Sequence, residues 1–101
     1  MKNYTRTLKI FLFISFAFAQ TTTYVPDDNF EQALIDLGYD NALDDSVLTA
    51  NISSVTSLDI DNLSISDLTG IEGFTALTEL RCFNNQLTIL DVSSNTALTK
   101  L

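Results

Sequence analysis

Apolar residues in the second half of the chain recur in short alternating segments, and the series restarts at a nearly constant interval. Alternation of this kind is typical of strands, which present every second side chain to one face. A single short repeat cannot bury such a face alone, so successive repeats must stack. Residues 55–101 are therefore predicted to form a solenoid, with a strand near residues 56–60. Its repeat positions are Leu58, Ile60, Leu77, Leu80, Cys82, Asn85, Leu87, Leu90, Val92 and Asn95.

The repeats carry a finer period inside each coil. Leu80 and Cys82 are followed ten residues later by Leu90 and Val92, so each 21-residue coil contains two similar halves. The alternation of the second pair predicts another short strand. A further repeat begins just before Leu101 and is not completed. We therefore expect a truncated array without the C-terminal cap that closes such solenoids.

The segment before the repeats has the period of an amphipathic helix. Phe30 and Leu34 belong to an apolar face with further members at i+3 and i+7, which predicts a helix over residues 28–37. Asp27 precedes this face and can accept hydrogen bonds from the free amides of the first turn. Gly38 follows the last apolar position and favours an end to the helix there.

A second, shorter helix is expected after a polar, turn-like segment. Asp44 or Asp45 could cap it, and Val47 and Leu48 would lie on its apolar side. Both helices precede the first repeat and lie at the N-terminal end of the predicted solenoid.

Residues 1–19 have the layout of a secretory signal peptide. Three basic residues precede an apolar run at 10–18, which ends in the small-residue motif Ala17-Phe18-Ala19. A buried core helix is the alternative interpretation, and the run is too short to span a bilayer comfortably. The protein is thus expected to be secreted or displayed at the cell surface. The predicted divisions are a signal peptide at 1–19, an exposed leader at 20–24, a helical N-terminal cap at 25–54 and incomplete repeats at 55–101.

Cleavage of the signal peptide would leave a strongly acidic chain. Three of the five basic residues lie within residues 1–19 and all 13 acidic residues lie beyond them, so the net charge becomes 2 − 13 = −11. Such a surface repels phosphates, which argues against nucleic acid and anionic membranes as partners. It is compatible with solubility outside the cell, with cationic partners and with divalent ions.

Candidate chemistry is sparse. The chain has no histidine, and its one cysteine, Cys82, replaces a leucine of the repeat, which favours a buried structural thiol and excludes an intrachain disulfide. Asp40, Asp44 and Asp45 crowd one loop, but their spacing does not match an EF-hand. Adjacent aspartates are explained by helix capping, and no nucleophile or base accompanies them. We therefore expect no enzyme activity, no catalytic residues, no metal and no cofactor.

The repeat register places charged residues side by side on the exposed strand face. An offset of 22 sets Asp59 beside Arg81, and an offset of 21 sets Glu79 beside Lys100, so opposite charges should pair along the sheet. An exposed aromatic residue beside an arginine is typical of an interface anchor. The candidate binding residues on this face are Ser57, Asp59, Asp61, Glu79, Arg81 and Phe83.

Three segments carry a resemblance to secreted bacterial leucine-rich repeat proteins. Residues 77–95 are similar to the nested 21-residue repeats common in Bacteroidetes-type surface proteins, and residues 65–71 to the 22-residue internalin repeat. Residues 25–30 resemble the start of the helical cap of such proteins. The resemblance implies an α/β solenoid, a right-handed leucine-rich repeat coil with a short parallel sheet and a helical N-terminal cap.

In this family the repeat asparagine turns inward and bonds to the backbone of the adjacent coil. The resemblance gives that role to Asn85 and Asn95. The equivalent position in the first coil is Leu63, with Asn62 one place away, so the first coil is expected to be irregular or to belong partly to the cap.

The functional expectation is a non-catalytic recognition scaffold that binds an extracellular protein or glycan at the bacterial surface. The alternative is the N-terminal targeting or spacer module of a larger secreted enzyme truncated after Leu101. A third interpretation is a fragment with no independent function. The identity of the ligand, the oligomeric state and the anchoring mechanism stay open.

Overall fold

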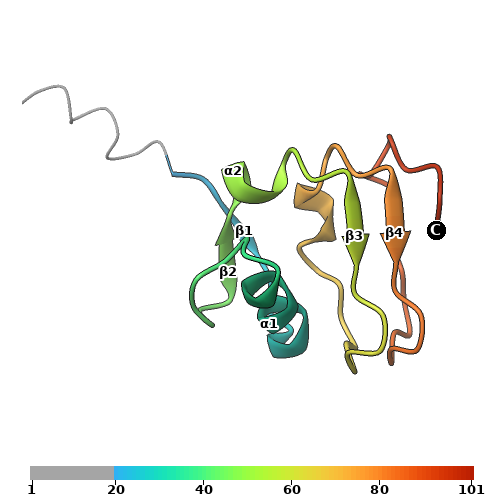
Figure 1. Cartoon of the computed structure of the whole chain (residues 1–101), viewed down its shortest axis with the longest axis horizontal. Helices are drawn as coiled ribbons and strands as arrows, with labels where there is room; N and C mark the ends of the chain where they lie inside the picture. The colour runs from blue at the N-terminus through green and yellow to red at the C-terminus, as the bar shows by residue number, and fades with distance from the viewer. Residues whose placement is uncertain (1–19) are drawn as a thin grey trace, which may run out of the picture.

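The structure, a computed structural model, describes residues 20–101, so the predicted signal peptide lies outside the described residues. Figure 1 shows an N-terminal region of helices and paired strands, residues 22–54, which we call the cap, followed by a repeat region in which β3 and β4 run side by side in the same direction. Each sheet has two strands. The elements in chain order are β1 (Thr22–Tyr24), α1 (Asp28–Asp36), β2 (Ser46–Leu48), α2 (Thr49–Ile52), β3 (Ser57–Asp59), the 3₁₀ helix η2 (Ile71–Gly73) and β4 (Glu79–Arg81).

The first predicted helix is confirmed as α1, with its end one residue earlier than expected. Asp27 is its N-cap residue, and its Oδ1 accepts hydrogen bonds from the amides of Asn29 at 2.9 Å and Phe30 at 3.1 Å. At the other end, Leu37 is the C-cap residue and Gly38 follows with a φ of 90°. Capping of the first turn and a left-handed glycine after the last turn therefore set the limits of α1.

The leader expected at 20–24 is corrected in its last three residues, which form a strand, although Thr22 and Tyr24 are exposed as expected. Thr22–Tyr24 forms β1, which pairs antiparallel with β2, and Thr23 is only 8% exposed. The Thr23 hydroxyl also lies 2.7 Å from the hydroxyl of Thr49 at the start of α2. A strand as short as β1 becomes recognisable only when its partner is known.

The second predicted helix is also corrected. Val47 and Leu48 lie in β2 rather than in a helix, and α2 begins only at Thr49. Val47 points into the core while its two neighbours are more accessible, which is the alternation of a strand. No side chain caps α2, so the capping role expected of Asp44 or Asp45 is wrong.

The predicted register of the repeats is confirmed. β3 and β4 pair in parallel with Leu58 opposite Leu80 and Asp59 opposite Arg81, which is the longer of the two expected offsets. An isolated parallel bridge between Glu79 and Lys100 continues the ladder with the shorter offset. Leucine side chains therefore stack in register on the core side of the strands.

Cap and repeats share one hydrophobic core. Phe30 of α1 and Phe74 of the first coil are both fully buried, and their ring centroids lie 6.4 Å apart. Gly70 allows the coil to approach the cap, because a Cβ there would lie 2.7 Å from the Val25 side chain and 2.8 Å from the Tyr24 carbonyl. Its φ of 110° likewise favours glycine.

The second strand predicted inside the coil, from Leu90 to Val92, is not formed. The Ser93 amide donates to Asp91 Oδ1 and the Asn95 amide donates to the Val92 carbonyl, so this segment turns instead of pairing. Leu90 is 37% exposed. The expected burial of Cys82 is incomplete as well, since its thiol packs against the core but stays half-buried.

Candidate functional site

The exposed face of β3 and β4 gathers the charged residues predicted for it around one guanidinium. Arg81 Nε lies 3.5 Å from Asp59 Oδ2, which confirms the predicted neighbour pair. A closer contact joins Arg81 Nη2 to Asp61 Oδ2 at 3.0 Å. The side chain of Asp61 is 13% exposed against 61% for Asp59, so Asp61 forms the better shielded of the two ion pairs.

Phe83 lies beside this cluster and is 56% exposed. The Arg81 guanidinium carbon is 5.6 Å from the centre of its ring, within cation–π distance. The Phe83 amide donates to Asp61 Oδ1 at 2.6 Å, so one carboxylate positions both neighbours. The exposed ring of Phe83 thus lies beside a cluster of ion-paired side chains. We call these four residues the Phe83 patch (Asp59, Asp61, Arg81 and Phe83).

The two other residues predicted for this face, Ser57 and Glu79, take no part in the ion pairs around Arg81. Ser57 is exposed and lies opposite Glu79 in the ladder. Glu79 shares the strand register with Lys100 as predicted, but both ion pairs found within residues 20–101 belong to Arg81. The structure therefore brings charges together around Arg81 and leaves Lys100 outside that cluster.

Asn85 connects the second coil to the first, as the resemblance implies. Its Oδ1 accepts from the amides of Leu63 and Ile65, both at 3.0 Å, and its Nδ2 donates to the Ile60 carbonyl at 2.8 Å. The side chain thus satisfies backbone groups that the irregular first coil leaves free. Leu63 occupies the asparagine position of that coil without making these bonds.

Asn95 plays a related part ten residues further on. It is 3% exposed, and its Nδ2 donates to the carbonyls of Ile71 at 2.9 Å and Phe74 at 3.1 Å. Both acceptors lie at or next to η2, in the segment through which the first coil leads back to the sheet, which we call its return segment. The nested period therefore places two asparagines in similar bonding roles, although only one of them accompanies a strand.

Sequence reasoning assigned Asp27 to helix capping and missed its second role. While Oδ1 caps α1, Oδ2 accepts from the Ser66 amide at 3.0 Å, the Ser66 hydroxyl at 3.2 Å and the Asp67 amide at 3.1 Å. Burial alone would raise the pKa of Asp27, but the hydrogen bonds from Ser66, Phe30 and Asp67 lower it overall. A single carboxylate therefore joins the cap to the first coil.

Glu31 was likewise missed as a functional candidate. It is fully buried, and its two oxygens accept from the amides of Asp44 at 3.1 Å and Asp45 at 2.9 Å. Burial, followed by the neighbouring Asp40 carboxyl group, raises the pKa of Glu31 from 4.5 to about 7 despite those amides. Carboxylate oxygens of Glu31, Asp40 and Asp44 lie within 4.8 Å of one another. The residue pattern alone gave no sign of this, because Glu31 reads as an ordinary first-turn acid.

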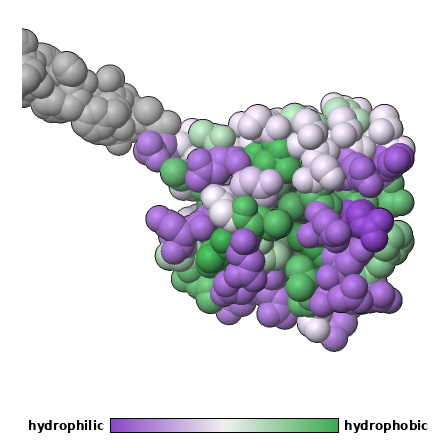
Figure 2. Space-filling model, in the orientation of Figure 1, coloured by the Kyte–Doolittle hydropathy of each residue, from purple (hydrophilic) through white to green (hydrophobic). Residues whose placement is uncertain are grey.

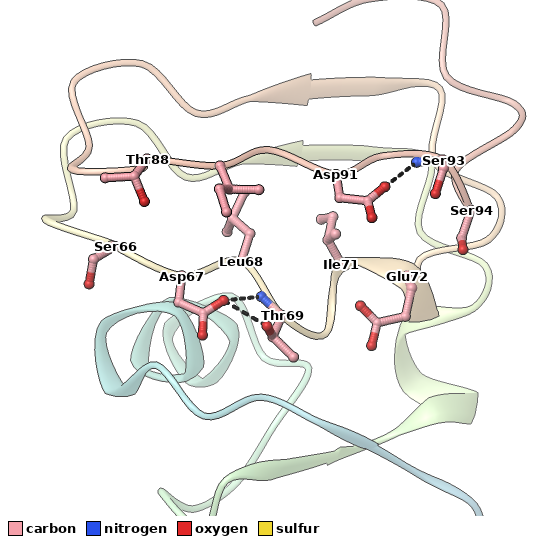
Figure 3. Close-up of a pocket in the computed structure, with 11 residues that line it drawn as sticks. Ser66, Asp67, Leu68, Thr69, Ile71, Glu72, Thr88, Asp91, Ser93 and Ser94 are labelled. Atoms are coloured by element: carbon pink, nitrogen blue, oxygen red, sulfur yellow. Dashed lines mark hydrogen bonds between the residues drawn. The ribbon is translucent and has the colours of Figure 1, made fainter.

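A cavity of about 660 Å³ lies between the return segments of the two coils (Figure 3). Three carboxylates line it, and each is bonded to its own turn. Asp67 Oδ1 accepts from the Thr69 amide at 2.8 Å and Asp91 Oδ1 from the Ser93 amide at 3.0 Å, while Glu72 accepts from the Gly70 amide. These acids stabilise turns and show no arrangement of nucleophile and base.

Comparison with known proteins places the chain near the internalins. No protein-family model matches it. It is 42% identical over 73 residues to internalin J of Listeria monocytogenes serotype 4b (strain F2365), and equally to internalin J of serovar 1/2a (strain ATCC BAA-679 / EGD-e). The aligned segment covers 72% of this chain but 8% of either relative, so the chain spans a small part of the relatives it matches.

Solved structures give the same result. The functional domain of internalin J from Listeria monocytogenes, which includes a cysteine ladder, matches 82% of this chain and 19% of that chain with a TM-score of 0.67 and 40% identity. An internalin (InlF) of strain 4b F2365 matches 76% of this chain and 23% of that one with a TM-score of 0.68, and at 24% identity it supports the fold alone. Together these likenesses support a bacterial, internalin-like leucine-rich repeat protein.

The described segment contains two small sheets and no closed solenoid. Within residues 20–101, no helix has the length and apolar character required to cross a membrane.

Proposed function

We propose that this chain is the cap and first coils of a secreted or cell-surface recognition protein that binds an extracellular protein or glycan without catalysis. The basic and apolar pattern of residues 1–19 supports export. The nested spacing of residues 77–95 supports a repeat of the Bacteroidetes type. The candidate contact surface is the exposed face of β3 and β4, from Ser57 to Phe83.

One observation carries the proposal, namely the exposed ring of Phe83. Most large aromatic and aliphatic side chains of the first coil are buried, whereas this ring is 56% exposed. Interface anchors are enriched in aromatic residues and arginine, and Arg81 lies against the ring. Because Asp61 holds the Arg81 side chain and the Phe83 backbone through hydrogen bonds, less conformational freedom remains to be lost there on binding.

Charge supports the same surface. Figure 2 shows hydrophilic side chains over much of the face drawn there, with hydrophobic patches between them. The Phe83 patch combines two carboxylates with one guanidinium, so it offers a polar rim around an apolar centre. Two short strands supply only part of a standard interface of roughly 1,600 Å², so the partner must also contact residues beyond β3 and β4.

The proposal can be tested by binding of the fluorescently labelled 101-residue chain to intact bacterial and epithelial cells in flow cytometry. Phe83→Ser is expected to weaken binding by about tenfold or more, as loss of a central anchor does. Ile89→Ser is the matched control, since Ile89 is 76% exposed and lines the cavity of Figure 3 instead of the strand face.

Treating the cells with a protease or with glycosidases beforehand separates protein partners from glycan partners. Equal binding of both variants and the wild type would contradict the role of the strand face. Binding of the wild type to none of the cells would contradict the recognition function itself.

A further inference from the structure

The loop that links α1 to β2 is attached to the helix through one buried acid. Both carboxylate oxygens of Glu31 accept hydrogen bonds from backbone amides of this loop, those of Asp44 and Asp45. The Asp45 carbonyl in turn accepts from the Val25 amide at 2.9 Å, next to β1. Glu31 therefore holds the loop where it enters the β1–β2 pair.

A second acid of the loop needs a donor at the same place. Asp40 Oδ2 is buried and has no hydrogen-bond partner, although Asp40 belongs to the carboxylate group within 4.8 Å around Glu31. A buried acceptor without a donor is costly, and two neighbouring ionised carboxylates repel each other. A proton held between Glu31 and Asp40 would remove both costs, because a protonated carboxyl donates where a carboxylate can only accept.

No cation is available to replace that proton within the described part of the chain. The groups that face Glu31 are Asp28 from its own helix and Asp40, Asp44 and Asp45 from the loop, all acidic. The two basic residues of the described segment are Arg81 and Lys100, both in the repeats. Within the described residues, the negative charge around Glu31 can therefore be reduced only by protonation of a carboxylate.

We propose that a proton shared by Glu31 and Asp40 fastens the 40–45 loop to α1, and that a rise in pH removes the proton and releases the loop. Release would free the Asp44 and Asp45 amides and loosen the chain where it enters β2. A cavity of about 360 Å³ lined by Asp40, Asp44 and Leu48 already borders the loop, so water can reach the opened segment. The cap would then be a pH-responsive element, independent of the Phe83 patch.

The sign follows from the direction of the shift. Since the folded-state pKa of Glu31 is raised from 4.5 to about 7, the closed loop holds a proton that the open loop gives up between these values. Closure is therefore favoured below this window and weakens progressively as pH rises through it. Above about 7 the dependence should level off.

Hydrogen exchange and carboxyl NMR of the isotopically labelled 101-residue chain test the proposal. Protection of the Asp44 and Asp45 amides, corrected for intrinsic exchange, is expected to fall by about tenfold per pH unit within the window, the equivalent of one proton. The Glu31 carboxyl carbon should titrate over the same range. In Glu31→Gln, whose amide can donate to Asp40 at every pH, protection should lose this dependence.

Glu72→Gln is the matched control, because the Glu72 carboxylate also accepts a backbone amide but is exposed. It should leave the pH dependence of the loop unchanged. If Glu31→Gln does not fold, the wild-type titration decides alone, and a Glu31 carboxyl that titrates near 4.5 would overturn the proposal. Saturable protection of the loop by added Ca²⁺, reversed by EDTA, would overturn it too, since the cluster would then hold a cation in place of the proton.

Discussion

The cap and the first coils differ in the side chains that connect segments distant in sequence. In the cap, two carboxylates make several of these connections, since Asp27 reaches Ser66 and Asp67 and Glu31 holds its loop. Between the coils, the amides of Asn85 and Asn95 bond to the coil before them, and Asp61 adds one carboxylate contact on the strand face.

This difference has a physical consequence. A carboxylate makes strong bonds to backbone amides, but those bonds change when it is protonated. An asparagine amide makes somewhat weaker bonds that no pH within the physiological range alters. The connections made by Asp27 and Glu31 should therefore respond to pH, whereas those made by Asn85 and Asn95 should respond chiefly to changes in shape and packing.

Removal of the aromatic contact between the regions should have the largest effect on stability. Phe30→Ala empties a fully buried site against Phe74 and is expected to lower the free energy of unfolding by about 3–5 kcal/mol. Chemical denaturation followed by circular dichroism measures the loss. Leu37→Ala, at a position that is 47% exposed near the end of the same helix, should cost less than about 1 kcal/mol. Two separate transitions in the wild type would contradict the shared core.

Loss of the connection that Asn85 makes between the coils should have the second largest effect on stability. Asn85→Ala leaves the amides of Leu63 and Ile65 and the Ile60 carbonyl without this partner, so a loss of about 2–4 kcal/mol is expected. The loss should be the same at every pH at which the protein folds, and denaturation at several pH values checks this. Gln86→Ala provides an exposed neighbour as the control. A strongly pH-dependent loss would remove the contrast between coil and cap.

Loss of the Asp27 connection should lower the free energy of unfolding by less than loss of the Asn85 connection, and the effect should depend on pH. Asp27→Ala is expected to destabilise the protein by about 1–3 kcal/mol through loss of the helix cap and of the bonds to Ser66 and Asp67. The hydrogen bonds that lower the pKa of Asp27 below 3.8 outweigh the opposing effect of its burial. Its contribution is therefore complete above 3.8 and is lost as pH falls through the folded-state pKa.

Acid denaturation midpoints of the wild type and Asp27→Asn measure this prediction. The asparagine keeps one acceptor oxygen but cannot titrate, so the variant should lose less stability on acidification than the wild type does. An identical decline in both proteins would mean that Asp27 is not the acid-sensitive connection. The direction is opposite to that expected for Glu31, which weakens the cap on the alkaline side.

The sequence predicts contacts that repeat and misses contacts that occur once. The pairing of Leu58 with Leu80 follows from periodicity, because every coil reproduces the same environment. The bonds of Asp27 to Ser66 and Asp67 join positions far apart in the chain without any repeat to signal them. Their presence depends on how the cap docks, which no local pattern encodes.

The same distinction explains the errors in secondary structure. The sequence of β1 predicts a leader, because a short segment with two threonines forms a strand only against β2, which lies beyond α1 in the chain. The alternation from Leu90 to Val92 predicts a strand because it copies that of Leu80 to Cys82, but Asp91 and Val92 accept turn hydrogen bonds instead. Periodicity thus locates the coils, and local hydrogen bonding decides which half of each coil pairs.

The smallest effect is expected at the Phe83 patch. Arg81→Ala removes both ion pairs, yet the Arg81 side chain is about half exposed, so stability should change by less than about 1 kcal/mol. A double-mutant cycle with Asp61→Ala should give a larger coupling energy than one with Asp59→Ala, because Asp61 is closer and better shielded. Lys100→Ala, which removes a charge outside this cluster, is the control. A loss of several kcal/mol on removal of Arg81 would mean that the patch holds the coils together, whereas a small loss leaves its exposed Phe83 ring available for a partner.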